Sequence, residues 1–161
     1  RAVEEVPGWE LLEMAVDSGA SITVIGEDHV KAVEAKNARP DLQYEVADGT
    51  HIPHLGEKEF SALTESGLLQ RLTAQVTEVN KALLSVSRIV KAGSTVVFDD
   101  SGSYIEHKAT GQKTAVYERN GAFQFNIAVP KGKGEEVSAV QLRENAQGFP
   151  RQGTLEADLF Y

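Results

Sequence analysis

The chain has 161 residues, of which 41% are hydrophobic and 25% are charged, and its formal net charge is −8. These values are typical of a globular domain that buries a real core. The acidic excess argues against a nucleic-acid partner, because neutralising phosphates requires clustered Lys and Arg. Cysteine is absent, which excludes disulfides, thiol catalysis and zinc–thiolate sites. No apolar run approaches the roughly 20 residues that span a bilayer, so we expect an intracellular, cytoplasmic protein without membrane contact.

An acidic residue, Asp17, stands between two apolar segments near the start of the chain. Residues 9–16 are predicted to form a strand that leads into it, and residues 22–25 a strand that leaves it. A buried carboxylate is costly unless it is paired or partly protonated, so an acid in this setting indicates chemistry. A hydroxyl donor, Ser18, and a glycine that allows a sharp turn, Gly19, follow it.

The next segments predict a helix and a hairpin. Residues 27–38 contain good helix formers with acidic residues early, which favours a helix. Residues 42–47 alternate as a strand, and residues 52–60 are predicted to return beside them. The turn signal Asp48-Gly49 between these two strands indicates a β-hairpin.

The second half of the chain is predicted to be mainly strands. Residues 68–79 are strand-like, and residues 82–92 are predicted to form a short amphipathic helix that ends at Gly93. Four short strands are expected beyond it, at residues 95–98, 103–107, 114–118 and 123–129. The fold class is therefore predicted to be mostly β with two short helices.

Four segments of this chain together resemble the retropepsin-like aspartic proteases of copia-class retrotransposon polyproteins. The catalytic triplet and its small neighbours match Asp17-Ser18-Gly19-Ala20-Ser21, and the flap hairpin resembles residues 46–56. Residues 83–88 resemble the segment that passes beneath the active site into a helix, and residues 93–98 resemble the start of the downstream β extension. The chain departs from many family members at Ser85, where they carry glycine; the copia class resembles this chain there.

The resemblance implies an acid-protease barrel with short helices and a C-terminal β-hairpin extension. Residues 1–93 would form the protease core, residues 94–130 the β extension packed on it, and residues 131–161 a linker or tail. It also implies an aspartic endopeptidase that hydrolyses peptide bonds of a polyprotein. Two carboxyl groups that share one proton would activate a water, as they do in the aspartic proteases.

The chain offers one convincing catalytic loop, so the second aspartate is expected from another copy, in a two-fold homodimer. The resemblance implies Asp17, Ser18 and Gly19 as catalytic residues, with Ser18 hydrogen-bonded across the dimer axis. It implies a polypeptide substrate, no metal and no cofactor. The implied substrate-binding residues are Ala20, Ser21, Asp48, Gly49, Thr50 and Ser85.

Two alternatives remain open. The first is a non-catalytic, β-rich protein-binding module that retains the protease fold. The second is a single-chain enzyme that pairs Asp17 with Asp100, since Asp100-Ser101-Gly102 repeats the triplet. An ordinary hairpin turn is the favoured interpretation of Asp100, because these residue types form turns readily.

The histidines are expected to lie at the surface. His51 and His54 are spaced so that a strand would point them to opposite faces, which argues against a shared metal. His29 and His107 are isolated in the sequence and are expected to be exposed.

Overall fold

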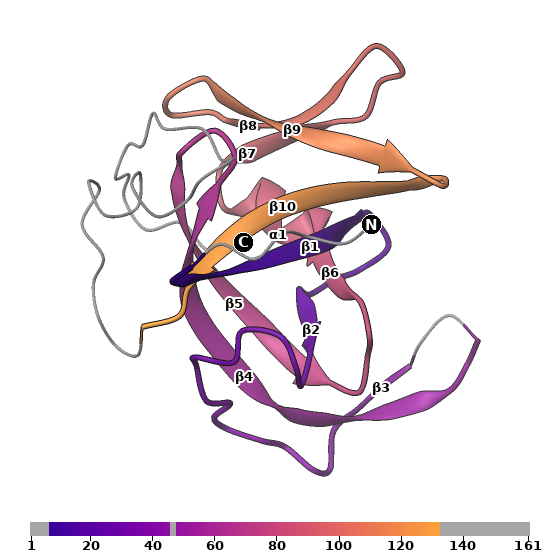
Figure 1. The fold of residues 1–161 in the computed structure, drawn as a ribbon. Coiled ribbons are helices and arrows are strands. Elements are labelled where there is room, and N and C mark those ends of the chain that lie inside the picture. Colours follow the sequence, from indigo (N-terminus) through magenta and orange to yellow (C-terminus); the bar gives the residue numbers. More distant parts are fainter. Residues whose placement is uncertain (1–6, 46–47, 133–161) are drawn as a thin grey trace.

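The computed structural model describes residues 7–45 and 48–132, and this part of the chain is mostly β (Figure 1). It contains ten strands and one short helix. The C-terminal segment predicted as a tail lies largely outside the described residues. The elements are β1 (Trp9–Asp17), β2 (Val24–Gly26), β3 (Gln43–Glu45), β4 (His51–Thr64), β5 (Leu69–Thr77), β6 (Ala82–Ser85), α1 (Val86–Lys91), β7 (Ser94–Val97), β8 (Ser103–His107), β9 (Gln112–Arg119) and β10 (Ala122–Pro130).

The strands form one sheet that closes on itself. Their order is β3-β4-β5-β2-β6-β1-β10-β9-β8-β7, and β4 also pairs with β10. This extra pairing, Ile127 with Thr64 and Ala128 with Leu63, joins β4, β5, β2, β6, β1 and β10 into a ring. Strand β6 lies between β1 and β2, parallel to the first and antiparallel to the second.

The core fills the inside of this ring because alternate residues of each strand face inward. On β5 the inward residues Leu72, Ala74 and Val76 are all buried. They pack in one cluster with side chains from β1, β4, β6 and β10 and with Ile89 of α1. Burying this apolar surface is the main stabilising contribution to the fold.

Strands β7, β8 and β9 form an antiparallel meander that lies above the ring in Figure 1. Ile105 and Val116 from the meander join the main core cluster. The rings of Phe98 and Phe123 lie 4.6 Å apart and connect the β7–β8 turn to β10. Although β10 follows the meander in sequence, it pairs with β1 from Trp9 to Ala15 and so belongs to the ring.

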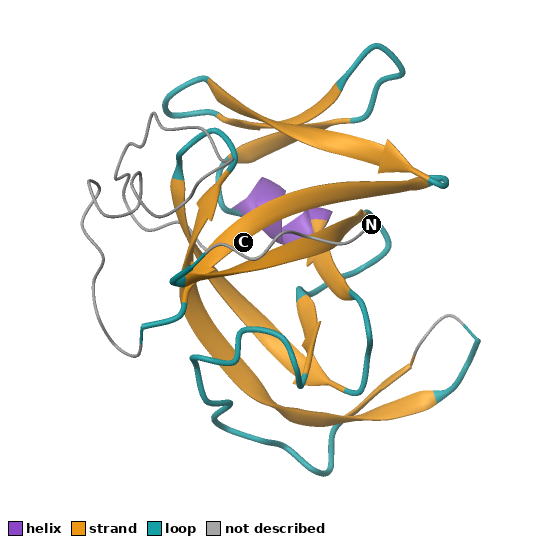
Figure 2. Ribbon diagram, viewed as in Figure 1, coloured by secondary structure: helices purple, strands orange, loops and turns teal. Residues whose placement is uncertain are grey.

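The helix predicted over residues 27–38 is wrong: this segment is a chain of turns, drawn as loop between β2 and β3 in Figure 2. Side chains from neighbouring strands replace the helical hydrogen bonds. The Glu10 carboxylate accepts the Val30 and Lys31 amides at 2.8 and 3.0 Å. The Lys58 ammonium donates to the carbonyls of His29 and Val30, both at 2.9 Å.

The helix predicted over residues 82–92 is wrong in its first part. Residues 82–85 form β6 because they pair with β1 on one side and β2 on the other. The helix begins only after Ser85, whose hydroxyl caps it by accepting the Arg88 amide at 3.2 Å. Within the described residues, no helix is long and apolar enough to cross a bilayer.

Candidate active site

The loop that carries Asp17 follows β1, which lies between β6 and β10 in the ring. Met14, Ala15 and Val16 are buried, and the burial decreases at Asp17, which is half-buried. Ser18, Gly19 and Ser21 are exposed, and Ala20 is half-buried. The carboxyl group therefore lies where a buried strand reaches the surface, a position at which an acid can meet a ligand.

The Asp17 carboxylate is held by its own loop. Its Oδ1 accepts the Gly19 amide at 2.7 Å, and the Ala20 amide approaches the Asp17 carbonyl at 3.4 Å. A Cβ at Gly19 would lie 3.3 Å from that carboxylate oxygen, closer than ordinary contact. Glycine at this position thus lets the carboxylate fold back onto the backbone amide.

Ser85 fastens the loop to the junction of β6 and α1. Asp17 and Ser85 are paired in register across the parallel strands β1 and β6. The Ser85 hydroxyl donates to the Ala20 carbonyl at 2.6 Å, and the Ser85 amide donates to the Thr23 hydroxyl at 3.2 Å. Ser85 is fully buried, so within one chain it supports the loop from beneath and does not present an open surface to a substrate.

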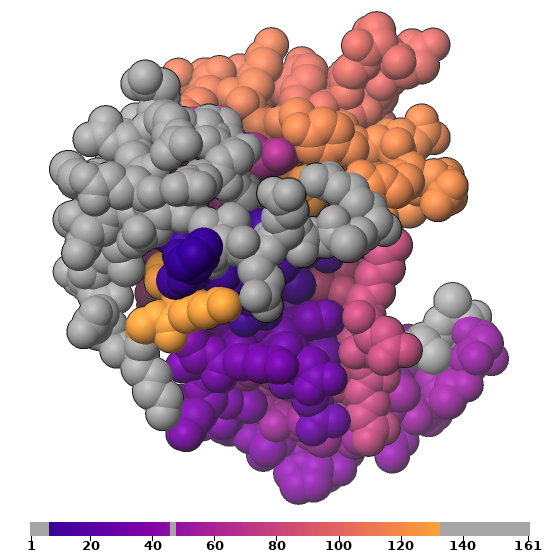
Figure 3. Space-filling view, in the orientation of Figure 1, coloured from indigo at the N-terminus to yellow at the C-terminus, as the bar shows by residue number. Residues whose placement is uncertain are grey.

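The predicted hairpin is present as β3 paired with β4, and its tip stands away from the rest of the surface in Figure 3. Asp48, Gly49 and Thr50 at this tip are exposed. The Asp48 carboxylate accepts the Thr50 amide at 2.9 Å, and hydrogen bonds from Thr50 lower the pKa of Asp48 below its usual value. Gly49 has φ +86°, a left-handed conformation that favours glycine.

The hairpin and the Asp17 loop lie on the same side of the molecule, the right-hand side of Figure 1. The structure thus puts the predicted site residues in two groups: the loop residues above β6, and the exposed hairpin tip.

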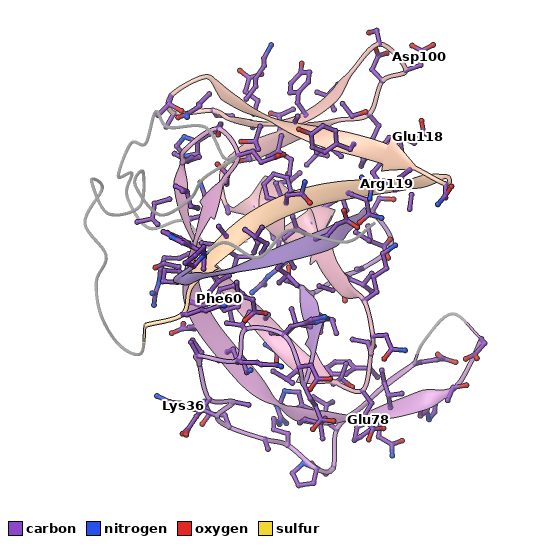
Figure 4. The ribbon with its side chains drawn as sticks, in the orientation of Figure 1. Lys36, Phe60, Glu78, Asp100, Glu118 and Arg119 are labelled. Carbon is purple, nitrogen blue, oxygen red and sulfur yellow. The ribbon has the colours of Figure 1, made fainter. Side chains whose placement is uncertain are left out.

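Asp100 lies in a different place. It is exposed in the turn between β7 and β8, at the outer end of the meander (Figure 4). The neighbouring Asp99 carboxylate accepts the Ser101 amide at 3.1 Å, and its pKa is lowered by hydrogen bonds from Ser101. The interpretation of this segment as a hairpin turn is therefore confirmed.

The expectation of exposed histidines is wrong for two of the four. His54 and His107 are 4% and 3% exposed, whereas His51 is exposed and His29 is half-buried. His51 and His54 do differ in burial, as expected for side chains on opposite faces of β4. His54 is buried because the loop before β3 folds over it, which no sequence pattern indicates.

Thr23 is a supporting residue that sequence reasoning missed. It is 1% exposed, and its hydroxyl accepts the Ser85 amide beneath the loop. The sequence does contain an indication of this role, because a hydroxyl in an otherwise apolar segment such as residues 22–25 needs a hydrogen-bond partner. The identity of that partner depends on the β2–β6 pairing, which the sequence does not reveal.

No protein-family model matches the chain, and no curated protein matches it either.

Proposed function

We propose that the protein is an aspartic endopeptidase of the retropepsin-like type, active as a homodimer with one Asp17 from each chain. The observation that carries the proposal is the support of the Asp17 loop. A half-buried carboxylate at the end of a central strand is positioned by Gly19, and the loop is fixed from below by Ser85. This rigidity suits a catalytic group, which must be held near its productive geometry.

The proposed chemistry needs a second carboxyl group beside the first. A two-fold axis close to the loop would bring the partner's equivalent loop opposite, so that the two groups share one proton across a water. One carboxylate would take a proton from the water while the protonated one polarises the scissile carbonyl. The products are a new carboxylic acid and an amine, with no cofactor needed.

The β3–β4 hairpin supports the proposal as the element that would close over a bound peptide. Its tip is exposed and stands away from the body, and β3 forms an edge of the sheet. An extended peptide can add to such an edge through main-chain hydrogen bonds. A polypeptide in extended form is therefore the proposed substrate class.

Asp17→Asn tests the proposal. We expect the variant to fold normally and to lose cleavage of an unstructured polypeptide mixture by at least about a thousandfold, because the amide cannot share the proton. Asp100→Asn is the matched control, since Asp100 lies in a similar sequence but in the meander turn, and its activity should equal that of the native chain. Full cleavage by Asp17→Asn, assayed from acidic to neutral pH, would refute the proposal. Loss of cleavage in Asp100→Asn would instead favour the single-chain enzyme.

A non-catalytic binding module is the second candidate. The observation that favours it is the bond from Gly19 to Asp17, which is also the geometry of a purely structural Asx turn. Sedimentation of the native chain at high concentration separates the two candidates. A strict monomer that cleaves no peptide would favour the binding module, whereas a dimer that cleaves favours the enzyme.

A further inference from the structure

The loop of residues 27–42 joins β2 to β3 and is held near its two ends by histidine rings. At the first end, the Gly26 amide donates to Nδ1 of His29 at 2.8 Å. At the second end, the Arg39 amide donates to Nδ1 of His54, which projects from β4, at 2.9 Å. Both bonds require a ring nitrogen with a free lone pair, so both histidines must be unprotonated at Nδ1.

The surrounding bonds fix His54 in one neutral form. Its Nε2 lies 2.8 Å from Oε1 of Gln75 on β5, and Nε2 of the same Gln75 donates to the Glu57 carboxylate at 2.9 Å. A carboxylate needs a donor, so the Gln75 amide must direct its oxygen to His54. The proton of His54 is therefore on Nε2, and its Nδ1 is the acceptor.

The charged and titratable groups around His54 come from several elements. Tyr44 of β3 packs against it edge-on, with ring centroids 5.9 Å apart. Arg39 contributes its amide from the loop, and Glu57 of β4 acts through Gln75. In the described part of the chain, the hydrogen-bond partners of the His54 ring are the Arg39 amide and the Gln75 side chain, and neither is a carboxylate.

The groups around His29 are of mixed charge. Glu10 of β1 and Asp28 favour its protonation, and Lys58 of β4 opposes it. Burial is the strongest influence, and it lowers the pKa of His29 below its usual value of 6.5. The neutral ring seen in the hydrogen bond from Gly26 is therefore the stable form near neutral pH.

We propose that residues 27–42 form a pH-sensitive loop, closed while Nδ1 of His29 accepts the Gly26 amide and released at this end when that ring takes up a proton. Protonation places a hydrogen on Nδ1, where it meets the backbone N–H that formerly donated to it. Protonation of His29 thus removes one bond and creates a donor–donor clash at the first end of the loop.

Release of this loop affects the base of the β3–β4 hairpin. Leu42, the last residue of the loop, accepts the His54 amide at 3.1 Å, and β3 begins at the next residue. The loop also pairs with β4 through an antiparallel bridge between Lys36 and Glu57. The hairpin tip should therefore gain freedom on acidification while the ring keeps its structure.

The direction of the pH effect follows from linkage. Because the folded loop holds a histidine whose pKa is lowered, the closed state binds fewer protons than the open state below about pH 6.5. The stability of the closed loop is complete above that pH and is lost as the pH falls through the lower, folded value. Each histidine that protonates on opening changes the opening equilibrium by up to about tenfold per pH unit.

Amide hydrogen exchange at residues 26–42 tests the proposal on the full chain. After correction for intrinsic exchange rates, we expect protection of the Gly26 amide to fall at least about fivefold between pH 7.5 and 5.5. Amides of β5, such as that of Leu72, should keep their protection. Equal protection of the loop at both pH values, or equal loss throughout the ring, would overturn the proposal.

One variant separates titration of the ring from its structural role. His29→Asn keeps an acceptor near the Nδ1 position without a titrating group, so the loop should lose its pH dependence. His51→Asn is the control, because that ring is exposed, and its pH dependence should equal that of the native chain. Persistence of the pH effect in His29→Asn would refute the role of this ring.

Should His29→Asn fail to fold, the native chain still tests the proposal. Ring nitrogen NMR at pH 7.5 should find His29 neutral, with Nδ1 unprotonated. A charged ring or a proton on Nδ1 at that pH would overturn the proposal. None of these measurements involves cleavage or dimerisation, so their outcome is independent of the proposed protease activity.

Discussion

The hydroxyl group of Ser85 links the Asp17 loop to the start of α1. It donates to Ala20, accepts from Arg88 and thereby serves both the loop and the start of α1. The residue is fully buried, so water cannot replace either bond without rearrangement. Loss of this hydroxyl should therefore affect the loop and the helix together.

Ser85→Ala is expected to lower the free energy of unfolding by about 2 kcal/mol, since a helix cap and a buried hydrogen bond are lost at once. Chemical denaturation measures this change. Ser87→Ala, at a half-buried residue two positions further along in α1, is the control and should change stability by no more than about 0.5 kcal/mol. Equal costs for the two variants would show that the Ser85 hydroxyl is not the anchor described above.

Lys58 is a second residue whose role depends on burial. The side chain is 5% exposed, and burial lowers the pKa of its ammonium group below the usual value. Lys58→Met should destabilise the fold by about 2–4 kcal/mol, because the carbonyls of His29 and Val30 lose their donor.

The control for Lys58 is Lys31→Met, whose side chain is exposed and should cost less than about 0.5 kcal/mol. Thermal or chemical unfolding at neutral pH checks both variants. If Lys58→Met were as stable as the native chain, the two carbonyls would have found other partners.

At the scale of elements, the approach of β2 to the turn after β5 depends on one glycine. A Cβ at Gly26 would lie 2.2 Å from the Val79 carbonyl oxygen, a backbone atom that cannot swing aside. Gly26→Ala should therefore destabilise the chain by about 3 kcal/mol or more. Gly111→Ala offers a comparison in open space, where only the left-handed backbone at φ +73° opposes a side chain, at about 1–2 kcal/mol.

Alternation and turn signals predicted most of the strands. β8 has the bounds expected for it, and the ends of β1, β5, β9 and β10 differ from the expected ones by at most two residues. These strands were predictable because their pattern of period two is set locally by the faces they bury. The hairpin was predictable for the same reason, with Asp48 and Gly49 marking its turn.

The two errors in helix prediction have a common cause in tertiary contacts. Residues 27–38 have good helix propensity, but Glu10 and Lys58 bond to the backbone there, and Val30 adopts φ +55° while fully buried. Residues 82–85 are apolar enough for a helix or a strand, and their pairing with β1 and β2 makes them a strand. Propensity is a weak guide wherever distant partners satisfy the backbone.

The candidate site was predictable in part. The acid, the glycine and the hairpin turn each have a local signature, and the structure puts Asp17 at the end of a buried strand. The contacts that hold the loop join Ser85 to Ala20 and to Thr23, which lie 65 and 62 positions earlier in the chain. The sequence alone does not show that residues so far apart in the chain lie in contact.

At the scale of the whole molecule, charge bears on the proposed homodimer. Each chain carries a formal net charge of −8, so two copies repel each other. Raising the ionic strength shortens the range of this repulsion, to about 8 Å at about 0.15 M salt. We expect the dimer dissociation constant to fall as salt is raised, by about threefold or more between roughly 0.05 and 0.5 M.

Sedimentation equilibrium across that range of salt concentrations measures the constant. Asp17→Asn removes one charge at the proposed axis and should dimerise at least as tightly as the native chain. A chain that stays monomeric at every salt concentration would exclude the homodimer.

The pairing of β1 with β10 also governs when the chain can fold during its synthesis. The Lys131 amide donates to the Gly8 carbonyl at 2.9 Å, so the residues just before β1 and just after β10 meet. A ribosome must therefore release almost the whole described segment before its opening strand gains a neighbour on that side. Until then Leu12, Met14 and the remaining inward side chains stay uncovered, and a nascent chain halted near residue 93 should be captured by chaperones or degraded.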